Sequence, residues 1–463
     1  MPARRNSQAA LDIAHHLHPR TDWRAHEASG PVMVDHGDGA EIVDASGRRY
    51  IEGMAGLWCA SLGFNHPRLA KAGAEQLAKL GFYHTFAHRS MDVVGELAEQ
   101  LAELAPPGLD RVCFNTSGSE ANETMVKLAW TYHAARGKPG KRKVISRDRG
   151  FHGSTIVAAS MSGLPVMHRE FGLPLPGFVH VRCADHLREG RPGESEEAFT
   201  QRLADELEQT ILAEGPDTIA AFIAEPILAG GGVVVPPKGY FEAVGAILER
   251  YDILMLDDEI VCGFGRTGNW FGCQTVGMKP DMMSVAKALS SSYFPISAVI
   301  ISDRVYQTVA DNHAGDQFGH GFTNSGHPVG AAIALEALKI YAEMDLLAEV
   351  RRKGARLQAG LEGLMANPYV GQVRGRGLML GVELLADRAS RRRFDPSLKL
   401  GAKVETAAAE QGLVVRSMGD VLGFCPPYII TDPQIDAIVE RFGRALDDVT
   451  PALREAAGAA TTA

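Results

Sequence analysis

The sequence predicts an α/β protein, in which a large domain with a mostly parallel β-sheet is followed by a smaller α+β domain. Two observations carry this prediction. Short apolar runs typical of buried strands alternate with helical patterns from about residue 90 to residue 325. Beyond Gly326 the pattern changes to long alanine- and leucine-rich helical stretches with a few short strands. Apolar runs of this kind are typical of parallel strands that helices cover on both faces.

The elements of the large domain are expected in alternating order. Residues 90–104 have apolar side chains at helical spacing, and Pro106 and Pro107 end that helix. A second helix is expected over residues 119–135, and the charged segment 182–197 is interpreted as a solvated connection. Strands are expected at residues 111–114, 143–146, 218–224, 253–256 and in the apolar run 281–287.

The smaller domain is expected to begin after Gly326. Residues 327–344 and 346–365 are two long helical stretches, and residues 400–411 form a third. Between and after them, residues 377–383 and 413–416 have the pattern of short strands. This mixture predicts an α+β unit.

Composition excludes several classes of protein. The chain has 463 residues, 45% of them hydrophobic, which is enough to bury a large core. With 47 basic and 56 acidic residues, its net charge of −9 argues against nucleic-acid binding. The 6 cysteines form no Cys-x-x-Cys pair, so neither a metal site nor a disulfide framework is expected. No apolar run reaches the roughly 18 residues of a membrane span, so we expect no membrane partner and a cytoplasmic location.

Three polar residues, Glu225, Asp258 and Lys287, stand at the ends of expected strands. Ligands of parallel sheets gather at the carboxyl ends of the strands, so these side chains are expected to share one site. A lysine beside a carboxylate can react with a carbonyl group and pair with an electron-poor ring. Taken alone, Lys287 could instead lay its stem along apolar surface, and Asp258 could cap a helix or loop.

Residues next to Asp258 add to this site. Because side chains alternate along a strand, Asp258 and Ile260 point one way while Asp257 and Glu259 point the other. A carboxylate and a branched apolar side chain on one face could pair with a ring nitrogen and pack on the ring.

Two glycine-containing segments indicate where a phosphate could bind. Residues 115–120 (NTSGSE) lie between a strand and a helix, where Gly118 allows close approach and Ser119 is expected to cap the helix. A capped turn without a ligand is the alternative. Residues 263–268 (GFGRTG) fit the dinucleotide pattern G-x-G-x-x-G, but no convincing helix follows, which argues against a dehydrogenase.

The combination of these motifs resembles the class III aminotransferases, which use pyridoxal 5′-phosphate. The segment 256–268 (LDDEIVCGFGRTG), followed by Pro280-Asp281 and Ala286-Lys287, carries the resemblance, which extends over nearly the whole chain and is closest to the ω-amino acid (amine):pyruvate branch. The resemblance implies fold type I of the pyridoxal-phosphate enzymes, with a seven-stranded sheet. It also implies three segments: residues 1–65 contribute to the small domain, residues 66–330 form the cofactor-binding domain, and residues 331–463 form the C-terminal small domain.

The resemblance also implies roles for individual residues. Lys287 would hold the cofactor through its amine and then carry a proton, and Asp258 would pair with the ring nitrogen. The implied cofactor-binding residues are Ser117, Gly118, Ser119, Phe151, His152, Glu225, Asp258, Ile260, Lys287 and Thr323. The implied substrate-binding residues are Trp58, Phe86, Phe151 and Arg416. The family often has tyrosine at the position of Phe151, so any polar role of that ring is in doubt.

The activity implied by the resemblance is transfer of an amino group from an amine or ω-amino acid to a keto acid, with pyruvate as the expected acceptor. Because Thr323 would reach the phosphate of the neighbouring subunit, a homodimer with shared active sites is expected. Arg416 would bind a carboxylate and swing aside for an uncharged amine. In isolation, Arg416 could be a surface arginine, and Trp58 and Phe86 could be core aromatics. Alternatives for the whole chain are an aminomutase, a decarboxylase or a non-catalytic protein that only binds the cofactor.

Overall fold

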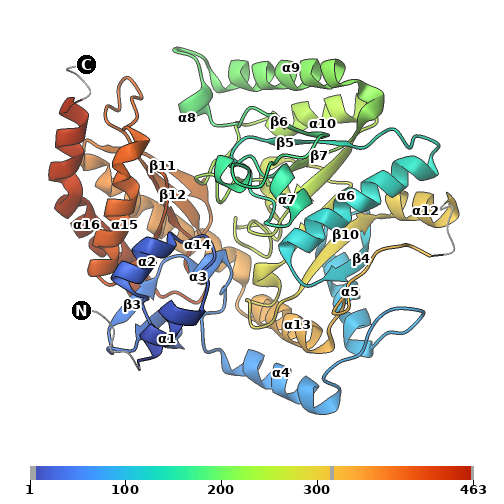
Figure 1. Ribbon diagram of the computed structural model, residues 1–463, viewed down its shortest axis with the longest axis horizontal. Coiled ribbons are helices and arrows are strands. Elements are labelled where there is room, and N and C mark those ends of the chain that lie inside the picture. Colours follow the sequence, from blue (N-terminus) through green and yellow to red (C-terminus); the bar gives the residue numbers. More distant parts are fainter. Residues whose placement is uncertain (1–6, 313–316, 460–463) are drawn as a thin grey trace.

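The computed structural model describes residues 7–312 and 317–459, which form two parts that lie side by side (Figure 1). The larger part is built on a seven-stranded sheet with the order β4-β10-β9-β8-β7-β5-β6. Its strands are β4 (Leu109–Asn115), β5 (Lys143–Arg147), β6 (Phe178–Val181), β7 (Ile219–Ala224), β8 (Leu254–Asp258), β9 (Met282–Val285) and β10 (Ser297–Ser302).

Most neighbouring strands of this sheet run parallel, which confirms the predicted α/β class. Parallel pairing joins β6, β5, β7, β8 and β9 in sequence across the sheet. Among the described strands of the sheet, only β10 runs antiparallel to its neighbours, β9 and β4. Because β7, β8 and β9 are adjacent and parallel, their carboxyl ends lie at one edge of the sheet.

Helices cover both faces of the large sheet. On β8, Leu254 and Leu256 pack with Met125 of α6, whereas Met255 belongs to the cluster that contains Phe241 of α10. This alternation produces two apolar layers, in which each fully buried leucine contributes about 1.5–3 kcal/mol. The helices of this part are α4 (Pro67–Lys79), α5 (Asp92–Leu104), α6 (Gly118–Ala135), α7 (Ile156–Met161), α8 (His186–Glu189), α9 (Glu196–Glu214), α10 (Tyr240–Arg250), α11 (Gly272–Val276) and α12 (Asp303–Asn312). Helix α13 (Pro328–Glu343) packs against α4 and α5.

The smaller part contains two four-stranded sheets. One is antiparallel and consists of β11 (Val370–Arg376), β12 (Met379–Leu384), β15 (Val421–Phe424) and β14 (Arg416–Met418). The other consists of β1 (Val34–Asp38), β2 (Glu41–Asp44), β3 (Arg49–Glu52) and β13 (Leu413–Val414). Parallel pairing of β3 with β13 joins segments from opposite ends of the chain. Helices α14 (Leu346–Gly363), α15 (Leu400–Glu410) and α16 (Asp432–Ala459) pack in this part. The division at residues 65 and 330 stays a prediction.

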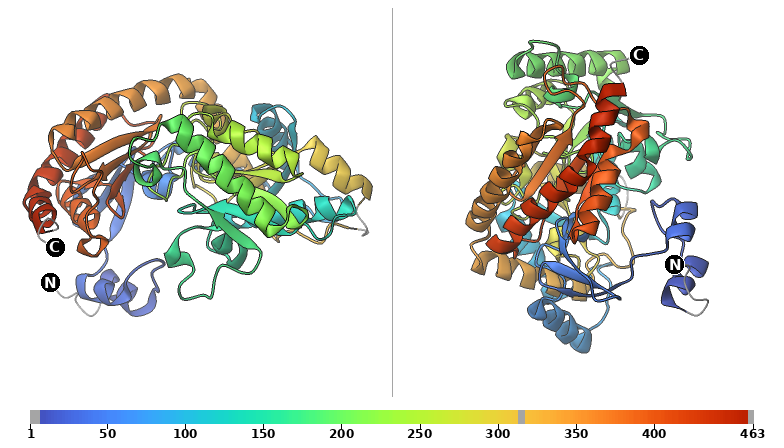
Figure 2. Two further views of the ribbon diagram at one scale, coloured as in Figure 1. Left: turned by 90° about the horizontal axis from the view of Figure 1, so that it is seen from above. Right: turned by 90° about the vertical axis from the view of Figure 1, so that its left-hand side faces the viewer.

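Two short helices begin the described chain. These are α1 (Gln8–His15) and α2 (Trp23–Ser29), and Figure 2 shows them standing off from the body of the molecule. A four-residue helix, α3 (Ala55–Trp58), follows β3. None of the helices formed by residues 7–312 and 317–459 is both long enough and apolar enough to cross a membrane.

The expectation of a solvated connection over residues 182–197 is wrong for residues 183–190, whereas residues 191–193 and 195–197 are exposed. This segment contains α8 and the first residues of α9, and Asp185 is buried. Arg188 of α8 forms an ion pair with the buried Glu383 of β12 at 2.6 Å. Asp185 and Arg188 are therefore folded inward, because Arg149 of the larger part and Glu383 of the smaller part compensate their charges.

Candidate active site

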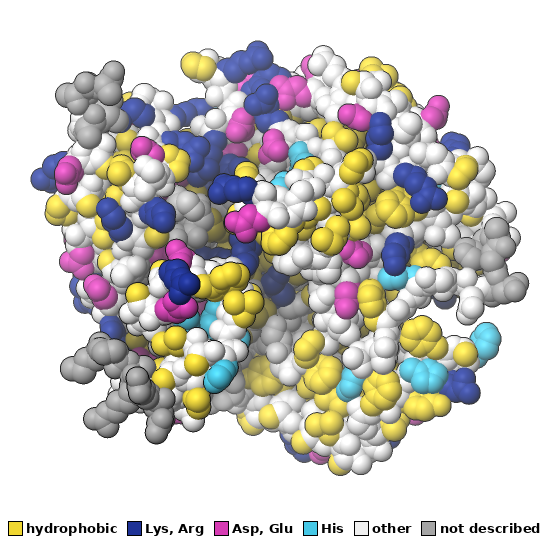
Figure 3. All heavy atoms as spheres, viewed as in Figure 1, with side chains coloured by type: hydrophobic (Ala, Val, Ile, Leu, Met, Phe, Trp, Pro, Cys, Tyr) yellow, Lys and Arg dark blue, Asp and Glu magenta, His cyan; other side chains and the backbone are white. Residues whose placement is uncertain are grey.

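A cavity of about 1040 Å³ lies at the junction of the two parts. Its wall contains Asp258, Lys287, residues at the start of α6, and Arg416 of the smaller part. In Figure 3 this junction is a hollow, bordered by basic side chains. The carboxyl ends of β7, β8 and β9 therefore converge with the start of α6 on one enclosed space, as the topology of the sheet requires.

Asp258 lies at the end of β8 and is 2% exposed. Asn122 Nδ2 donates a hydrogen bond to its Oδ2 at 2.8 Å, and His152 Nδ1 lies 2.8 Å from the same oxygen. The backbone N–H of Ile260 donates to Oδ1 at 3.2 Å. Asn122 is itself fixed, because Ser284 Oγ donates to its Oδ1 at 2.7 Å. These contacts hold the carboxylate in one orientation at the cavity wall.

Lys287 follows β9 and is half-buried at the cavity wall. Its φ of 48° lies in the left-handed region, which residues other than glycine rarely adopt. Strain of this kind persists where surrounding contacts impose it, and here Tyr341 Oη donates to the neighbouring Ala288 carbonyl at 2.6 Å. Within the described chain, Lys287 Nζ has no hydrogen-bond or ion-pair partner, so its amine is available to a ligand in the cavity.

The turn before α6 forms an anion cradle. Ser117, and not Ser119 as expected, is the N-cap, and it forms a capping box with Glu120. Glu120 lies three residues after Ser117, and its Oε2 accepts hydrogen bonds from the N–H groups of Thr116 and Ser117, at 2.8 and 3.1 Å. In the described part of the chain, the N–H groups of Gly118 and Ser119 have no hydrogen-bond acceptor. They lie in the cavity wall, where the positive end of the helix dipole favours an anion.

Close packing supports this cradle. A Cβ added to Gly118 would lie 2.6 Å from Ile260 Cδ1, and one added to Gly153 would lie 2.4 Å from Ser119 Oγ. The Ser154 N–H donates to Ser119 Oγ at 3.0 Å, which fixes the segment after His152 against α6. The amine, the carboxylate and the cradle fit an aldehyde ligand that carries a phosphate and a ring nitrogen.

Glu225 lies directly after β7 and is buried. Its Oε1 accepts the Phe151 N–H at 3.0 Å, and its Oε2 accepts the Ala229 N–H at 2.9 Å. Burial, followed by the charge of Asp258, raises the pKa of this carboxyl above its usual range. Glu225 therefore joins two segments of the cavity wall, one of which presents the Phe151 ring.

Trp58 and Arg416 line the cavity from the smaller part. Trp58 is buried and has a φ of 64°. Its segment begins at Glu52, whose Oε1 accepts the Met54 N–H at 3.0 Å. Burial raises the pKa of Glu52 to about 7. The pairing of β3 with β13 brings this segment next to Leu413 and Val414, which lie just before Arg416 in the chain.

Phe86 and Thr323 lie outside the cavity of the single chain. Phe86 is 45% exposed and Thr323 is also exposed. The two belong to neighbouring segments, because a Cβ added to Gly321 would lie 3.0 Å from the Phe86 ring. The remaining residues implied by the resemblance, including Ser117, His152 and Ile260, all line the cavity.

The structure reveals residues that sequence reasoning missed. Asn122 of α6 contacts Asp258, but its position within a helix had no distinguishing pattern. Arg20 lines the cavity from the turn between α1 and α2. Arg149 also lines it, and belongs to a polar network that spans the junction.

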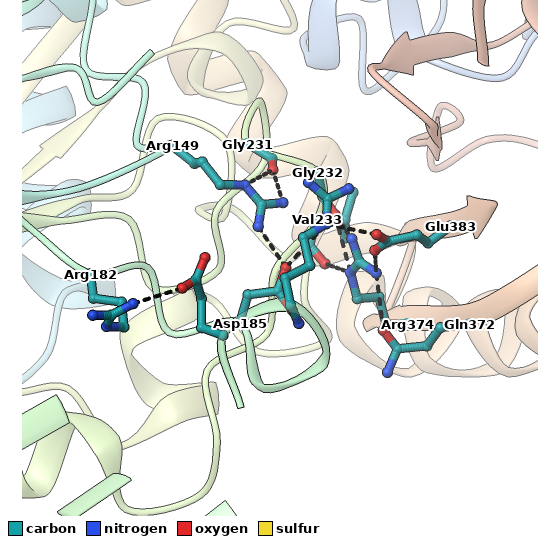
Figure 4. Close-up of polar contacts among 11 residues, drawn as sticks. Arg149, Arg182, Asp185, Gly231, Gly232, Val233, Gln372, Arg374 and Glu383 are labelled. Carbon is teal, nitrogen blue, oxygen red and sulfur yellow. Dashed lines mark hydrogen bonds and ion pairs between the residues drawn. The ribbon is translucent and has the colours of Figure 1, made fainter. Parts of the chain in front are cut away.

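Figure 4 shows that network, which fixes residues 231–233 beside the cavity. Arg149 Nη1 donates to Asp185 Oδ2 at 2.6 Å, and its Nε donates to the Gly231 carbonyl at 3.0 Å. Arg374 of β11 forms an ion pair with Glu383, and its Nε donates to the Val233 carbonyl at 2.9 Å. The guanidinium groups of Arg149 from the larger part and Arg374 from the smaller part thus both bind residues 231–233. This loop therefore links the position of the smaller part to the cavity wall.

Known proteins resemble this chain over nearly its full length. The sequence model of the family "Aminotransferase class-III" matches residues 24–446. Gamma aminobutyrate transaminase 3, chloroplastic, from Solanum lycopersicum is 45% identical over 427 residues, which cover 92% of this chain and 82% of that protein. The crystal structure of the omega transaminase from Pseudomonas jessenii in complex with PMP has a TM-score of 0.95 at 49% identity, covering 97% of this chain and 99% of that one.

A second solved structure agrees with these relatives. A transaminase solved with L-ala has a TM-score of 0.90 at 50% identity, covering 97% of this chain and 100% of that chain. Similarity at this level confirms fold type I, and enzymes of this family depend on pyridoxal 5′-phosphate. Both the match of the family over residues 24–446 and the identity to relatives lead to one conclusion: the chain belongs to the class III aminotransferases.

Proposed function

We propose that this aminotransferase moves an amino group from an amine or ω-amino acid to a keto acid, with pyruvate as the acceptor, by a ping-pong mechanism. The observation that carries the proposal is the convergence of Lys287, Asp258 and the anion cradle on one cavity. The names of the relatives support the substrate class: one is a gamma aminobutyrate transaminase, and another structure contains L-ala, the amino acid formed from pyruvate.

Lys287 and Asp258 would perform the chemistry. When bound, pyridoxal 5′-phosphate supplies an aldehyde carbon that accepts amines and a ring that withdraws electrons from the substrate. Lys287 Nζ would bind the cofactor covalently and, once released, would take a proton from the carbon that carries the amino group. Asp258 would hold a proton on the ring nitrogen, because a buried carboxylate favours a neighbouring positive charge.

Other cavity residues would position the cofactor. Ser117, Gly118 and Ser119 would hold its phosphate at the start of α6, where the N–H groups of Gly118 and Ser119 have no acceptor among the described residues. Phe151 and Ile260 would pack on opposite faces of the ring. His152 and Glu225 would act through the cavity wall, since His152 contacts Asp258 and Glu225 holds the Phe151 backbone.

The substrate would lie between Trp58, Phe151 and Arg416. The planar guanidinium of Arg416 matches a carboxylate, so it would bind the keto acid and swing aside for an uncharged amine.

A homodimer would complete each site. The apolar side chains Leu77, Leu80, Phe82, Tyr83 and Phe86 are exposed in the single chain, which is typical of a surface that another subunit covers. Phe86 and Thr323 are close to each other but lie outside their own cavity. We place Phe86 and Thr323 of each subunit at the edge of the other subunit's site.

A cytoplasmic location is proposed from the free state of all 6 cysteines, which is typical of a reducing compartment. An aminomutase or decarboxylase is the alternative function, since both use a lysine and an acid in the same places. The two differ in their need for an acceptor, because only an aminotransferase requires an external keto acid.

The test is a panel of amine donors with the purified holoenzyme. Donors are first added alone, and the visible absorbance of the cofactor should bleach as the amino group is transferred. Addition of pyruvate should restore the absorbance and release alanine in equal amount. Turnover without a keto acid would favour the mutase or decarboxylase, and no bleaching with any donor would rule out the proposal.

A further inference from the structure

Arg20 occupies an unusual place at the cavity. It lies in the turn between α1 and α2, far in sequence from the other lining residues. Its Cζ lies 5.6 Å from the centroid of the Phe151 ring, a distance typical of a cation–π contact. The φ of Arg20 is 51°, in the left-handed region. A short turn therefore delivers a guanidinium to the ring that borders the reacting centre.

The turn that carries Arg20 is fixed on both sides. Thr21 Oγ1 donates to the Pro19 carbonyl at 3.0 Å, and Trp23 Nε1 donates to the His18 carbonyl at 3.0 Å. His18 Nε2 lies 2.7 Å from Asp12 Oδ2 of α1. These contacts stabilise the strained backbone and keep the arginine directed to the cavity, although much of its side chain is exposed.

Some arginines of the cavity wall form ion pairs with acidic residues, and others do not. Arg149 forms an ion pair with Asp185, and Arg188 forms one with Glu383. Within residues 7–312 and 317–459, Arg20 and Arg416 have neither an acidic partner nor a hydrogen-bond acceptor for the guanidinium.

Arg20 and Arg416 line the same cavity, one from the turn before α2 and the other from β14. Burial, followed by the positive charge of Arg416, lowers the pKa of Arg20. Like charges in one cavity repel each other, and an anion between them reduces that repulsion. An anionic ligand in the cavity would give both guanidinium groups a partner of opposite charge.

We propose that Arg20 is a second carboxylate-binding residue, which together with Arg416 holds the far end of an ω-amino acid donor. This inference rests on the proposed aminotransferase function and narrows its donor class. A carboxylate has two oxygens with about four acceptor positions, so it can receive hydrogen bonds from two arginines at once. An amine of equal length without a carboxylate leaves both guanidinium groups unpaired, so the enzyme prefers donors that end in a carboxylate.

The test compares two donors of equal length, 6-aminohexanoate and hexylamine, in the donor half-reaction without a keto acid. Wild-type holoenzyme should bleach with a higher second-order rate constant for 6-aminohexanoate. Arg20→Gln should lower that constant about 10- to 100-fold, the loss expected for one charged hydrogen-bonding group. The constant for hexylamine should stay unchanged. Arg20→Lys should lose less than Arg20→Gln, because it keeps the charge without the fork.

A binding measurement separates recognition from turnover. Calorimetry with hexanoate, which has the carboxylate but no amine, should show about tenfold weaker binding to the Arg20→Gln holoenzyme than to wild type. The matched control is Arg24→Gln on α2, an exposed arginine whose partner is Glu27, and it should behave as wild type in both assays.

The outcomes distinguish the inference from the function on which it rests. Equal losses for the two donors, or no loss for either, together with unchanged hexanoate binding, would overturn the role of Arg20 while the aminotransferase function stands. If no donor bleaches the cofactor, the proposed function itself fails.

Discussion

Replacement of Asp258 by asparagine removes one negative charge from the cavity while preserving the shape of the side chain. Asn122 Nδ2, His152 Nδ1 and the Ile260 N–H surround the Asp258 carboxylate, and an amide oxygen can replace part of these contacts. The phosphate cradle at α6 is untouched. The substitution therefore tests the charge at this position and leaves most of the cofactor site in place.

The expected loss follows from the burial of Asp258. An adjacent opposite charge raises the pKa of a basic group by about 1–3 units, and each unit corresponds to about 1.4 kcal/mol, or tenfold. Because Asp258 is 2% exposed, solvent screens its charge little, and the upper part of that range applies. We expect kcat to fall about 10²- to 10³-fold, in line with the removal of a preorganised electrostatic group, while the cofactor remains bound.

Asp257→Asn is the matched control, assayed by steady-state turnover and cofactor absorbance. Asp257 is also buried, but it lies outside the cavity wall. Burial, followed by the charge of the neighbouring Glu259, raises its pKa well above the usual range. We expect kcat of this variant to equal that of wild type. Near-normal kcat in Asp258→Asn, or equal losses in both variants, would refute the assigned role of Asp258.

Three further predictions concern other parts of the molecule. Burial raises the pKa of Glu52 from 4.5 to about 7, so the folded state keeps a proton that the unfolded chain has lost within that interval. The contribution of Glu52 to the free energy of unfolding is therefore full below pH 4.5 and decreases by roughly 3 kcal/mol as the pH rises to about 7. Glu52→Gln should lack this part of the decrease. Identical Tm-versus-pH profiles of the variant and the wild type would contradict this prediction. Arg416→Ala should reduce kcat/KM for pyruvate about 10- to 100-fold but spare hexylamine in the donor half-reaction, whereas equal losses would exclude the dual role. Thr323→Ala should lower the activity of the homodimer. Mixing this variant with Lys287→Ala subunits should restore activity, because an intact Lys287 then meets an intact Thr323 of the partner subunit. No restoration would argue against shared sites.

Much of the cavity could be predicted because the sheet is parallel. Strand ends at Glu225, Asp258 and Lys287 are visible in the sequence as polar residues after apolar runs, and adjacent parallel strands bring such ends to one edge. The start of α6 was also predictable, although the capping box shows that Ser117 rather than Ser119 is the cap. Strand ends and helix starts therefore have local sequence patterns that predict their positions to within about two residues.

The parts that the sequence did not reveal depend on distant contacts. Asn122 stands inside a helix, and only its neighbours His152, Asp258 and Ser284 distinguish it from any other polar helical residue. Strand β10 is inserted antiparallel between β4 and β9, an order that periodicity does not encode.

Ion pairs near the junction are hidden from the sequence for the same reason. Asp185 and Arg188 belong to a charged stretch that is solvated in most proteins, yet here their partners come from other segments. Arg20 precedes the large domain entirely, and nothing in its local sequence places it at the cavity.

The most direct test of the account is to identify the lysine that carries the cofactor. Borohydride treatment of the holoenzyme links pyridoxal 5′-phosphate irreversibly to the amine that holds it, and peptide mass spectrometry then locates the linkage. We predict that the cofactor is found on the peptide that contains Lys287, and that prior incubation with an amine donor prevents the labelling. A label on another lysine, or labelling that no donor prevents, would contradict the central claim.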